Sequence, residues 1–302
     1  MSAQDDIILP FQVGDTTIRG RLVRLGPAVD EILSRHKFND PLSMLLGETA
    51  ALVSMLGAAL KFDGKLILQL QGDGPVSMVV ADYTVGGALR ATASVVADHE
   101  WSVDDAKGPE LHFLLRKGTM AMTIDQGKDM ERYQGVTPLE GATLSEGAVN
   151  YFAQSEQIPT TIKLAIGKVS LPGEEPVWRA GGIMVQFMPG EGGTRERGEA
   201  ELLRETDQDD WDNASAKLNT TQLDELLDPT LTPEELLYRL YHEDKVRVFD
   251  TLPVHFECTC AREKVAAVLE QYTQDQLDEI AEDGKIEVTC DFCREAYEFE
   301  VS

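Results

Sequence analysis

The chain has 302 residues, of which 42% are hydrophobic, and a formal net charge of −26 at pH 7. This length allows two domains, and the apolar content is sufficient for a packed core. No run of 18 apolar residues occurs, which argues against a membrane-spanning segment. Such an acidic chain also lacks the basic surface that phosphate backbones require, so we expect neither a membrane nor a nucleic-acid partner.

The first quarter of the chain predicts a hairpin and two helices. Alternating apolar residues between 7 and 25 surround a turn near Gly14. A short helix is expected over residues 27–37, and a longer one over residues 40–62 with Asp40 as its N-cap. Apolar residues cover more than one face of the longer helix, so we expect it to be buried. Glu48 inside it is a candidate functional carboxylate, although a lone helical Glu is more often exposed or paired.

The middle of the first half predicts an antiparallel meander with glycine-rich turns. The expected strands cover residues 65–71, 76–83 and 88–95. The turn Gly72-Asp73-Gly74 resembles a phosphate-binding loop, but such a loop opens a helix and carries a Lys and a Ser or Thr, whereas here a strand follows. We therefore reject a phosphate site.

Further strands and a helix complete the first expected domain. Residues 111–116 and 119–124 predict a hairpin, and Thr143 with Glu146 forms the capping-box pattern of a helix over residues 143–157. The last expected strands cover residues 160–166 and 181–188. The interpretation is an α+β N-terminal domain, residues 1–189, with a mostly antiparallel sheet and packed helices.

Residues 190–240 predict a helical linker. Residues 190–199 have the composition of a connector, and four short helices are expected after them. The helices cover residues 201–205, 211–217, 221–227 and 232–240. Each has one apolar face, and helices this short are marginal unless packed. The linker is therefore expected to be metastable, able to cover apolar surface in one state and leave it in another; a plain connector is the alternative.

The last segment, residues 241–302, contains all four cysteines, as Cys258-Thr-Cys260 and Cys290-Asp-Phe-Cys293. A strand over 246–249 precedes them. Helices over 261–272 and 274–282 and strands over 286–289 and 297–301 are expected around them. Four thiolates brought together by a small fold favour one tetrahedral zinc ion. His255 is a further candidate ligand, but four thiolates already fill the site.

The cysteine spacing leaves several interpretations open. Neighbouring cysteines two or three residues apart can close on each other, which would remove all four ligands, and small zinc modules depend on ~10–16 kcal/mol of metal-binding energy for folding. A redox switch, a static structural zinc site and a permanent pair of disulfides therefore all fit. A thiol–disulfide oxidoreductase is a further alternative, but it lacks a thioredoxin-like βαβ setting.

Two other features bear on the class of protein and its location. The five histidines lie in no recognisable hydrolase motif, so we expect a non-enzymatic protein. The first residues, Met-Ser-Ala-Gln-Asp-Asp, lack the basic and apolar regions of a signal peptide, so we expect a cytoplasmic location. In that compartment clustered cysteines indicate metal or redox use.

The cysteine motifs and their surroundings resemble one known family. The chain is similar to the redox-regulated bacterial heat-shock proteins of 33 kDa, also called 33 kDa chaperonins, over nearly its whole length. The paired C-x-C and C-x-x-C motif is the most specific part of the likeness. The matching residues are 47–50, 60–65, 68–74, 151–152, 155–159, 180–182, 240–243, 256–265 and 284–294.

The resemblance implies an ATP-independent holdase chaperone. It implies that zinc on Cys258, Cys260, Cys290 and Cys293 keeps the reduced protein inactive. Oxidation would then form Cys258–Cys260 and Cys290–Cys293 disulfides, release zinc and unfold residues 241–302 together with the linker. The implied partners are unfolded or partly unfolded client proteins, bound by the N-terminal domain, and a second copy of the chain in an oxidised homodimer.

Overall fold

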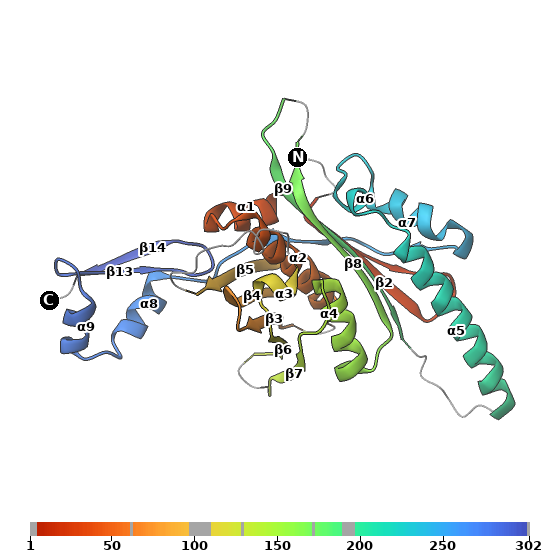
Figure 1. Cartoon of the computed structure of the whole chain (residues 1–302), viewed down its shortest axis with the longest axis horizontal. Helices are drawn as coiled ribbons and strands as arrows, with labels where there is room; N and C mark the ends of the chain where they lie inside the picture. The colour runs from red at the N-terminus through yellow and green to blue at the C-terminus, as the bar shows by residue number, and fades with distance from the viewer. Residues whose placement is uncertain are drawn as a thin grey trace.

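The computed structural model describes residues 5–60, 63–96, 110–127, 130–170, 173–188 and 197–300. Two sheets form the core, with one helix between them (Figure 1). The first sheet has the order β10 (Arg247–Val248), β1 (Ile7–Gln12), β2 (Ile18–Leu25), β9 (Val177–Phe187) and β8 (Thr160–Val169), and β11 (Leu252–Pro253) also pairs with β1. The second has the order β12 (His255–Phe256), β5 (Ala88–Val95), β4 (Val76–Thr84), β3 (Lys65–Gly72), β6 (Gly118–Asp125) and β7 (Tyr133–Pro138). The prediction of an α+β fold rich in antiparallel strands is confirmed; the pairing of β12 with β5 is parallel.

The helix between the sheets is α2 (Asp40–Gly57), which contacts β2, β8 and β9 of the first sheet and β3, β4 and β5 of the second. Its cap is Asn39 rather than Asp40, because the Asn39 side chain accepts a hydrogen bond from the amide of Leu42 at 3.2 Å. Apolar residues all round the helix are buried, as predicted, because a sheet lies on each side. The helix ends at Gly57, before the predicted end, and residues 61–62 lie outside the described residues.

The predicted strand over residues 111–116 is wrong. Residues Leu111–Leu114 form a short helix, α3, which buries Leu111, Leu114 and the following Leu115 on one side. That spacing is helical, and the short apolar run hides it. The strand β6 pairs instead with β3 and with β7, an edge strand that the sequence analysis did not predict.

Two other helices support the core. The helix α1 (Pro27–His36) packs against α2. The N-cap of α4 (Leu144–Tyr151) is Thr143, whose hydroxyl accepts from the amide of Glu146 as predicted; the Glu146 carboxylate accepts from the Ala142 amide and not from that of Thr143, so the capping box is only half formed. The predicted helix over residues 143–157 continues beyond α4 as one wide turn, η1 (Phe152–Glu156).

Three helices cover the outer face of the first sheet (Figure 1). They are α5 (Arg197–Asn219), α6 (Leu223–Leu227) and α7 (Pro233–Tyr241). The two helices predicted over 201–205 and 211–217 are one continuous helix, and residues 190–196 of the predicted connector lie outside the described residues. Side chains of these helices share a second hydrophobic cluster with the sheet; its fully buried members include Leu218, Leu226, Leu236, Leu237 and Tyr241.

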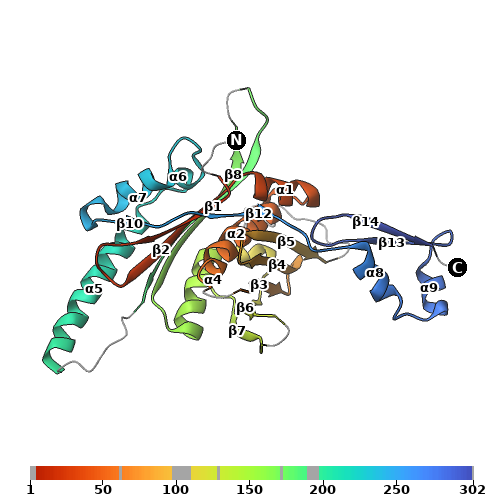
Figure 2. The same ribbon diagram turned by 180° about the vertical axis from the view of Figure 1, so that it is seen from behind.

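The C-terminal segment first follows the edges of both sheets and then projects from one end of the molecule (Figure 2). After the 3-10 turn η2 (His242–Asp244), β10 and β11 cover the outer edge of β1, and β12 covers the outer edge of β5. The projecting part contains α8 (Arg262–Leu269), α9 (Gln274–Ile280) and the hairpin of β13 (Lys285–Thr289) with β14 (Ala296–Glu300). The predicted helices and strands around the cysteines are therefore present: both helices are shorter than expected, β13 is one residue longer, and β14 begins and ends one residue earlier.

Candidate metal centre

Two short loops bring the four cysteines together. Cys258 and Cys260 follow β12 directly, and Cys260 lies just before α8. Cys290 and Cys293 lie in the turn between β13 and β14, which is closed by hydrogen bonds from the Cys290 amide to the Glu295 carbonyl (2.8 Å) and from the Arg294 amide to the Cys290 carbonyl (2.9 Å). All four are free thiols; Cys293 is buried and the others are half-buried.

The four sulfur atoms form a compact cluster, with every pair within 4.8 Å. The Sγ atoms of Cys258 and Cys290 are 3.7 Å apart, and those of Cys260 and Cys293 are 3.3 Å apart. A tetrahedral zinc ion with Zn–S bonds of ~2.3 Å would hold its sulfurs ~3.8 Å apart. The donor set and its spacing therefore fit a four-thiolate metal ion.

Tyr297 on β14 lies against this cluster. Its hydroxyl is 3.2 Å from the sulfur of Cys260, and this hydrogen bond is the main cause that lowers the pKa of Cys260 to about 7. Burial instead raises the pKa of the Cys258 and Cys293 thiols. The Tyr297 hydroxyl thus favours a thiolate at Cys260, the protonation state that metals and oxidants require.

The second cysteine loop is held against the core by polar contacts. Thr92 on β5 donates its hydroxyl to the Asp291 carbonyl at 2.8 Å, and Arg35 on α1 donates to the Cys293 carbonyl at 3.1 Å. The guanidinium of Arg90 lies 4.1 Å from the centroid of the Phe292 ring. The cluster is therefore positioned by residues far from it in the sequence, which the sequence analysis did not identify.

The first cysteine loop has its own contacts with the core. Arg90 donates to the Thr259 hydroxyl at 3.3 Å and is itself paired with Asp82 at 2.8 Å. The ring of Phe256 lies below the guanidinium of Arg35, 5.1 Å away. Arg90 thus contacts both cysteine loops. Arg35 contacts the second cysteine loop and the strand β12, which leads to the first.

The other candidate residues do not join the cluster. His255 is half exposed and its Nε2 lies 3.1 Å from the Glu257 carboxylate, so it is paired elsewhere. Glu48 on α2 is half-buried, and among the described residues it has no hydrogen-bond or ion-pair partner; burial raises its pKa to about 7. It is therefore neither exposed nor paired, contrary to the commoner expectation for a helical Glu.

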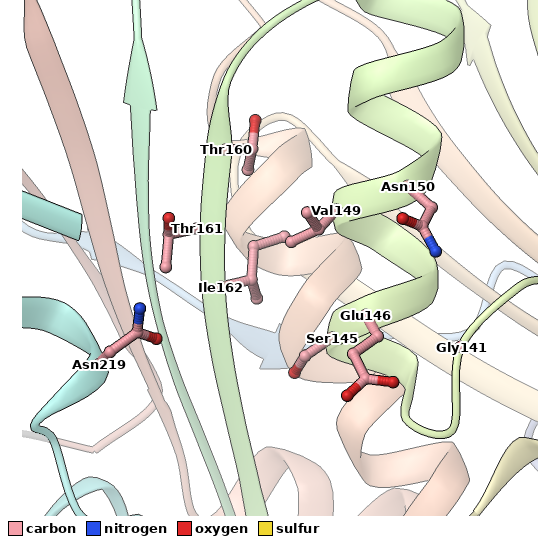
Figure 3. Close-up of a pocket in the computed structure, with 9 residues that line it drawn as sticks. All are labelled: Gly141, Ser145, Glu146, Val149, Asn150, Thr160, Thr161, Ile162 and Asn219. Carbon is pink, nitrogen blue, oxygen red and sulfur yellow. The ribbon is translucent and has the colours of Figure 1, made fainter. Parts of the chain in front are cut away.

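A hollow of about 440 Å³ lies between α4 and β8 (Figure 3). Two of its polar side chains bond within the protein: the Glu146 carboxylate accepts from the Ala142 amide at 2.7 Å, and the hydroxyls of Thr161 and Ser215 are 2.6 Å apart. These contacts stabilise the start of α4 and the packing of α5 on β8. In the part of the chain that the structure describes, no helix is both long and apolar enough to cross a bilayer.

The fold and the cluster define an α+β protein with a four-thiol site that is able to hold a metal ion. The family model described as Hsp33 protein matches residues 6–300. The 33 kDa chaperonin of Caulobacter vibrioides (strain NA1000 / CB15N) is 43% identical over 298 residues, which cover 98% of this chain and 95% of the relative. That of Shewanella loihica is 37% identical over 297 residues, covering 98% and 93%.

A solved structure gives the same fold. The crystal structure of the 33 kDa chaperonin (heat shock protein 33 homolog) from Thermotoga maritima matches with a TM-score of 0.79 at 23% identity, covering 98% of this chain and 95% of that one. The chain therefore belongs to the Hsp33 family.

Proposed function

We propose that the protein is a redox-regulated, ATP-independent holdase chaperone of the bacterial cytoplasm, without enzymatic activity. In the reduced state Cys258, Cys260, Cys290 and Cys293 hold one zinc ion, and the protein is inactive. Oxidants convert the cysteines to disulfides, zinc is lost, and the unfolding of residues 190–302 uncovers apolar surface on the core, residues 1–189. Unfolding client proteins bind there, and the oxidised protein forms a homodimer.

The observation that carries this proposal is the sulfur cluster itself. Zinc bound to four thiolates offsets half of their negative charge and ties both loops into one module. Hydrogen peroxide can take two electrons from each cysteine pair: one S–S bond forms between the two thiolate sulfurs, the O–O bond breaks, and its two oxygen atoms take up two protons from the solvent and leave as two molecules of water. A second equivalent oxidises the second pair, after which no thiolate remains to hold a metal.

The family resemblance favours pairing between neighbours, Cys258 with Cys260 and Cys290 with Cys293. In the structure close sulfur contacts also join the two loops, Cys258 to Cys290 at 3.7 Å and Cys260 to Cys293 at 3.3 Å. In a tetrahedral cluster all sulfur pairs are close, so these distances do not select a pairing. Neighbour pairing is supported by chain connectivity, because it can persist after the two loops separate.

The covered face of the first sheet supports a hidden client surface. Seven apolar residues of the sheet lie in the cluster beneath α5–α7 and are almost fully buried. They are Leu9, Phe11, Ile18, Leu22, Ala165, Ile183 and Val185. If α5–α7 leave, this face becomes an exposed apolar patch of the kind that binds unfolded chains.

The path of the chain links the cluster to these helices. Phe256 of β12 is two residues before Cys258, and β12, β11 and β10 lead back along the sheet edges to α7. Each of these strands is only two residues long, so little pairing energy opposes its detachment. Loss of the metal module thus weakens the anchor at the C-terminal end of the helical cover.

One observation favours a second candidate, a static zinc module for protein interaction. Thr92, Arg35 and Arg90 hold the cysteine loops against the core, as expected for a permanent clip. In that case peroxide would leave the folded thiols and the metal in place.

One experiment separates the two candidates. The zinc-loaded, reduced protein is treated with peroxide at mild heat, and zinc release, disulfide pairing by peptide mapping, and suppression of the aggregation of a thermally unfolding protein are followed together. The switch predicts release of one zinc per chain, neighbour disulfides and a gain of suppression. Retained zinc with unchanged suppression would instead support the static module.

A further inference from the structure

Among the residues that the structure describes, Arg24 is the largest fully buried side chain, and it binds main-chain carbonyls. It lies on β2, facing α6 and α7, and is 1% exposed. Its Nη2 donates to the Glu225 carbonyl at 2.9 Å, and its Nη1 donates to the carbonyls of Asp228 (2.8 Å) and Leu231. All three acceptors belong to the segment 225–231, which comprises the end of α6 and most of the loop that leads to α7.

Arg179 on the adjacent strand β9 adds a fourth carbonyl. Its Nε donates to the Leu227 carbonyl at 3.0 Å, while its other two nitrogens bind the carboxylate of Asp5. Gly181, which pairs with Arg24, lets the segment lie close, because a Cβ at this position would come within 2.5 Å of the Leu226 carbonyl. Two buried guanidinium groups thus hold the main chain of 225–231 against the sheet.

The nature of these contacts makes the site insensitive to sequence. No hydrogen bond joins Arg24 to a carboxylate of the described residues; carbonyl oxygens satisfy its charged terminal nitrogens. The side chains of Leu226 and Leu231 meanwhile enter the apolar cluster of the same sheet face. The segment therefore contributes two things that any unfolded polypeptide also offers, namely free carbonyls and apolar side chains.

We propose that Arg24 and Arg179 form a carbonyl clamp for unfolded polypeptides, occupied in the folded protein by residues 225–231. The inference rests on the proposed function, since the clamp opens only when α6 and α7 leave the sheet. An extended apolar segment of a client then replaces residues 225–231: its carbonyls accept from the two arginines and its apolar side chains pack on Leu22 and Ile183. The apolar face of the sheet provides hydrophobic contacts, and the two arginines position the backbone of the client segment.

The test uses the full-length, fully oxidised, zinc-free protein and a short amidated peptide of apolar and uncharged polar residues, with affinity measured by calorimetry. Loss of charge-assisted hydrogen bonds in Arg24→Met should weaken peptide binding about tenfold. Arg19→Met is the matched control, because Arg19 lies on the same strand but is exposed and points to the opposite face. It should bind like the wild type.

A change of peptide affinity in the opposite direction would refute the proposal. A purely apolar surface would bind the peptide equally or more tightly in Arg24→Met, because methionine adds apolar area, and that outcome would overturn the clamp. If Arg24→Met does not fold, Arg24→Lys replaces it; lysine keeps the charge but lacks the planar fork, so weaker binding is again expected and unchanged binding refutes the inference.

Failure of the proposed function is recognised separately. Oxidised wild-type protein that binds no peptide would refute the holdase proposal and, with it, the client role of the clamp. Wild-type binding that Arg24→Met leaves unchanged would refute only the clamp. In the reduced, zinc-loaded protein the same variant should show faster proteolysis within residues 225–231 at unchanged zinc content.

Discussion

Leu236 offers a direct test of whether α5–α7 hide the client surface. It lies on α7, is 0% exposed and packs in the cluster between the helices and the first sheet. Truncation of a buried leucine to alanine costs ~2–5 kcal/mol. These contacts exist only while α7 lies on the sheet, so the cost falls on the closed state. At about 1.4 kcal/mol per factor of ten, the open population rises about thirtyfold or more.

The assay is made on reduced, zinc-loaded protein without oxidant. Hydrogen exchange in Leu236→Ala should accelerate by about that factor over residues 207–241 and remain unchanged in β3 and β4. The variant should also gain suppression of client aggregation. Leu223→Ala is the matched control, because Leu223 on α6 is 55% exposed and the same truncation there removes little buried contact.

Two outcomes would refute this reasoning. If Leu236→Ala opens residues 207–241 but gains no suppression, the sheet face beneath α5–α7 is not the client surface. If exchange in that segment does not change, α7 is held by something other than its apolar packing.

Three further predictions concern the metal cluster and the core. Cys258→Ser should weaken zinc binding and leave residues 207–241 partly unfolded without oxidant; near-native protease resistance there would contradict the coupling. Thr92→Val loses one hydrogen bond to the second cysteine loop, ~1 kcal/mol, so zinc transfer to a chelator should be about fivefold faster. Ser77→Ala, which removes a solvent-exposed hydrogen bond to the Ser94 carbonyl, should have no effect. Burial raises the pKa of Glu48 to about 7, so the folded state loses stability as pH rises from the unfolded-state pKa through 7. The free energy of unfolding in urea should therefore differ between Glu48→Gln and the wild type by an amount that is about 2–3 kcal/mol more favourable to the variant at about pH 8 than at about pH 4. An equal difference at both pH values would show that Glu48 does not ionise in a buried site.

The strands and the cysteine cluster follow closely from the sequence, because alternation and cysteine spacing are local signals. The run at Leu111 was misread as a strand since a short apolar run has the same appearance in either structure, and only burial of Leu114 and Leu115 together reveals the helix. The edge strand β7 carries a real period-two pattern, with Gly135 and Thr137 buried between exposed neighbours, but glycine and proline mask it.

The contacts that hold the functional parts in place are not readable from the sequence. Arg24 and Arg179 look like ordinary exposed positions of alternating strands, and only the return of residues 225–231 onto the sheet buries them. The same holds for Thr92, whose partner lies 199 residues further along the chain. Side chains that act on distant carbonyls leave no local pattern, because the acceptor is common to all residues.

The three two-residue strands β10, β11 and β12 also determine the order in which the molecule comes apart. Detachment that starts at Cys258 removes β12 first and bares the edge of β5, and only later removes β11 and β10 from β1. A bared strand edge is a template for pairing with another chain. The second sheet should thus expose an unpaired strand edge before the first sheet does. The earliest self-association, or the earliest pairing with a strand of another protein, should therefore take place beside β5.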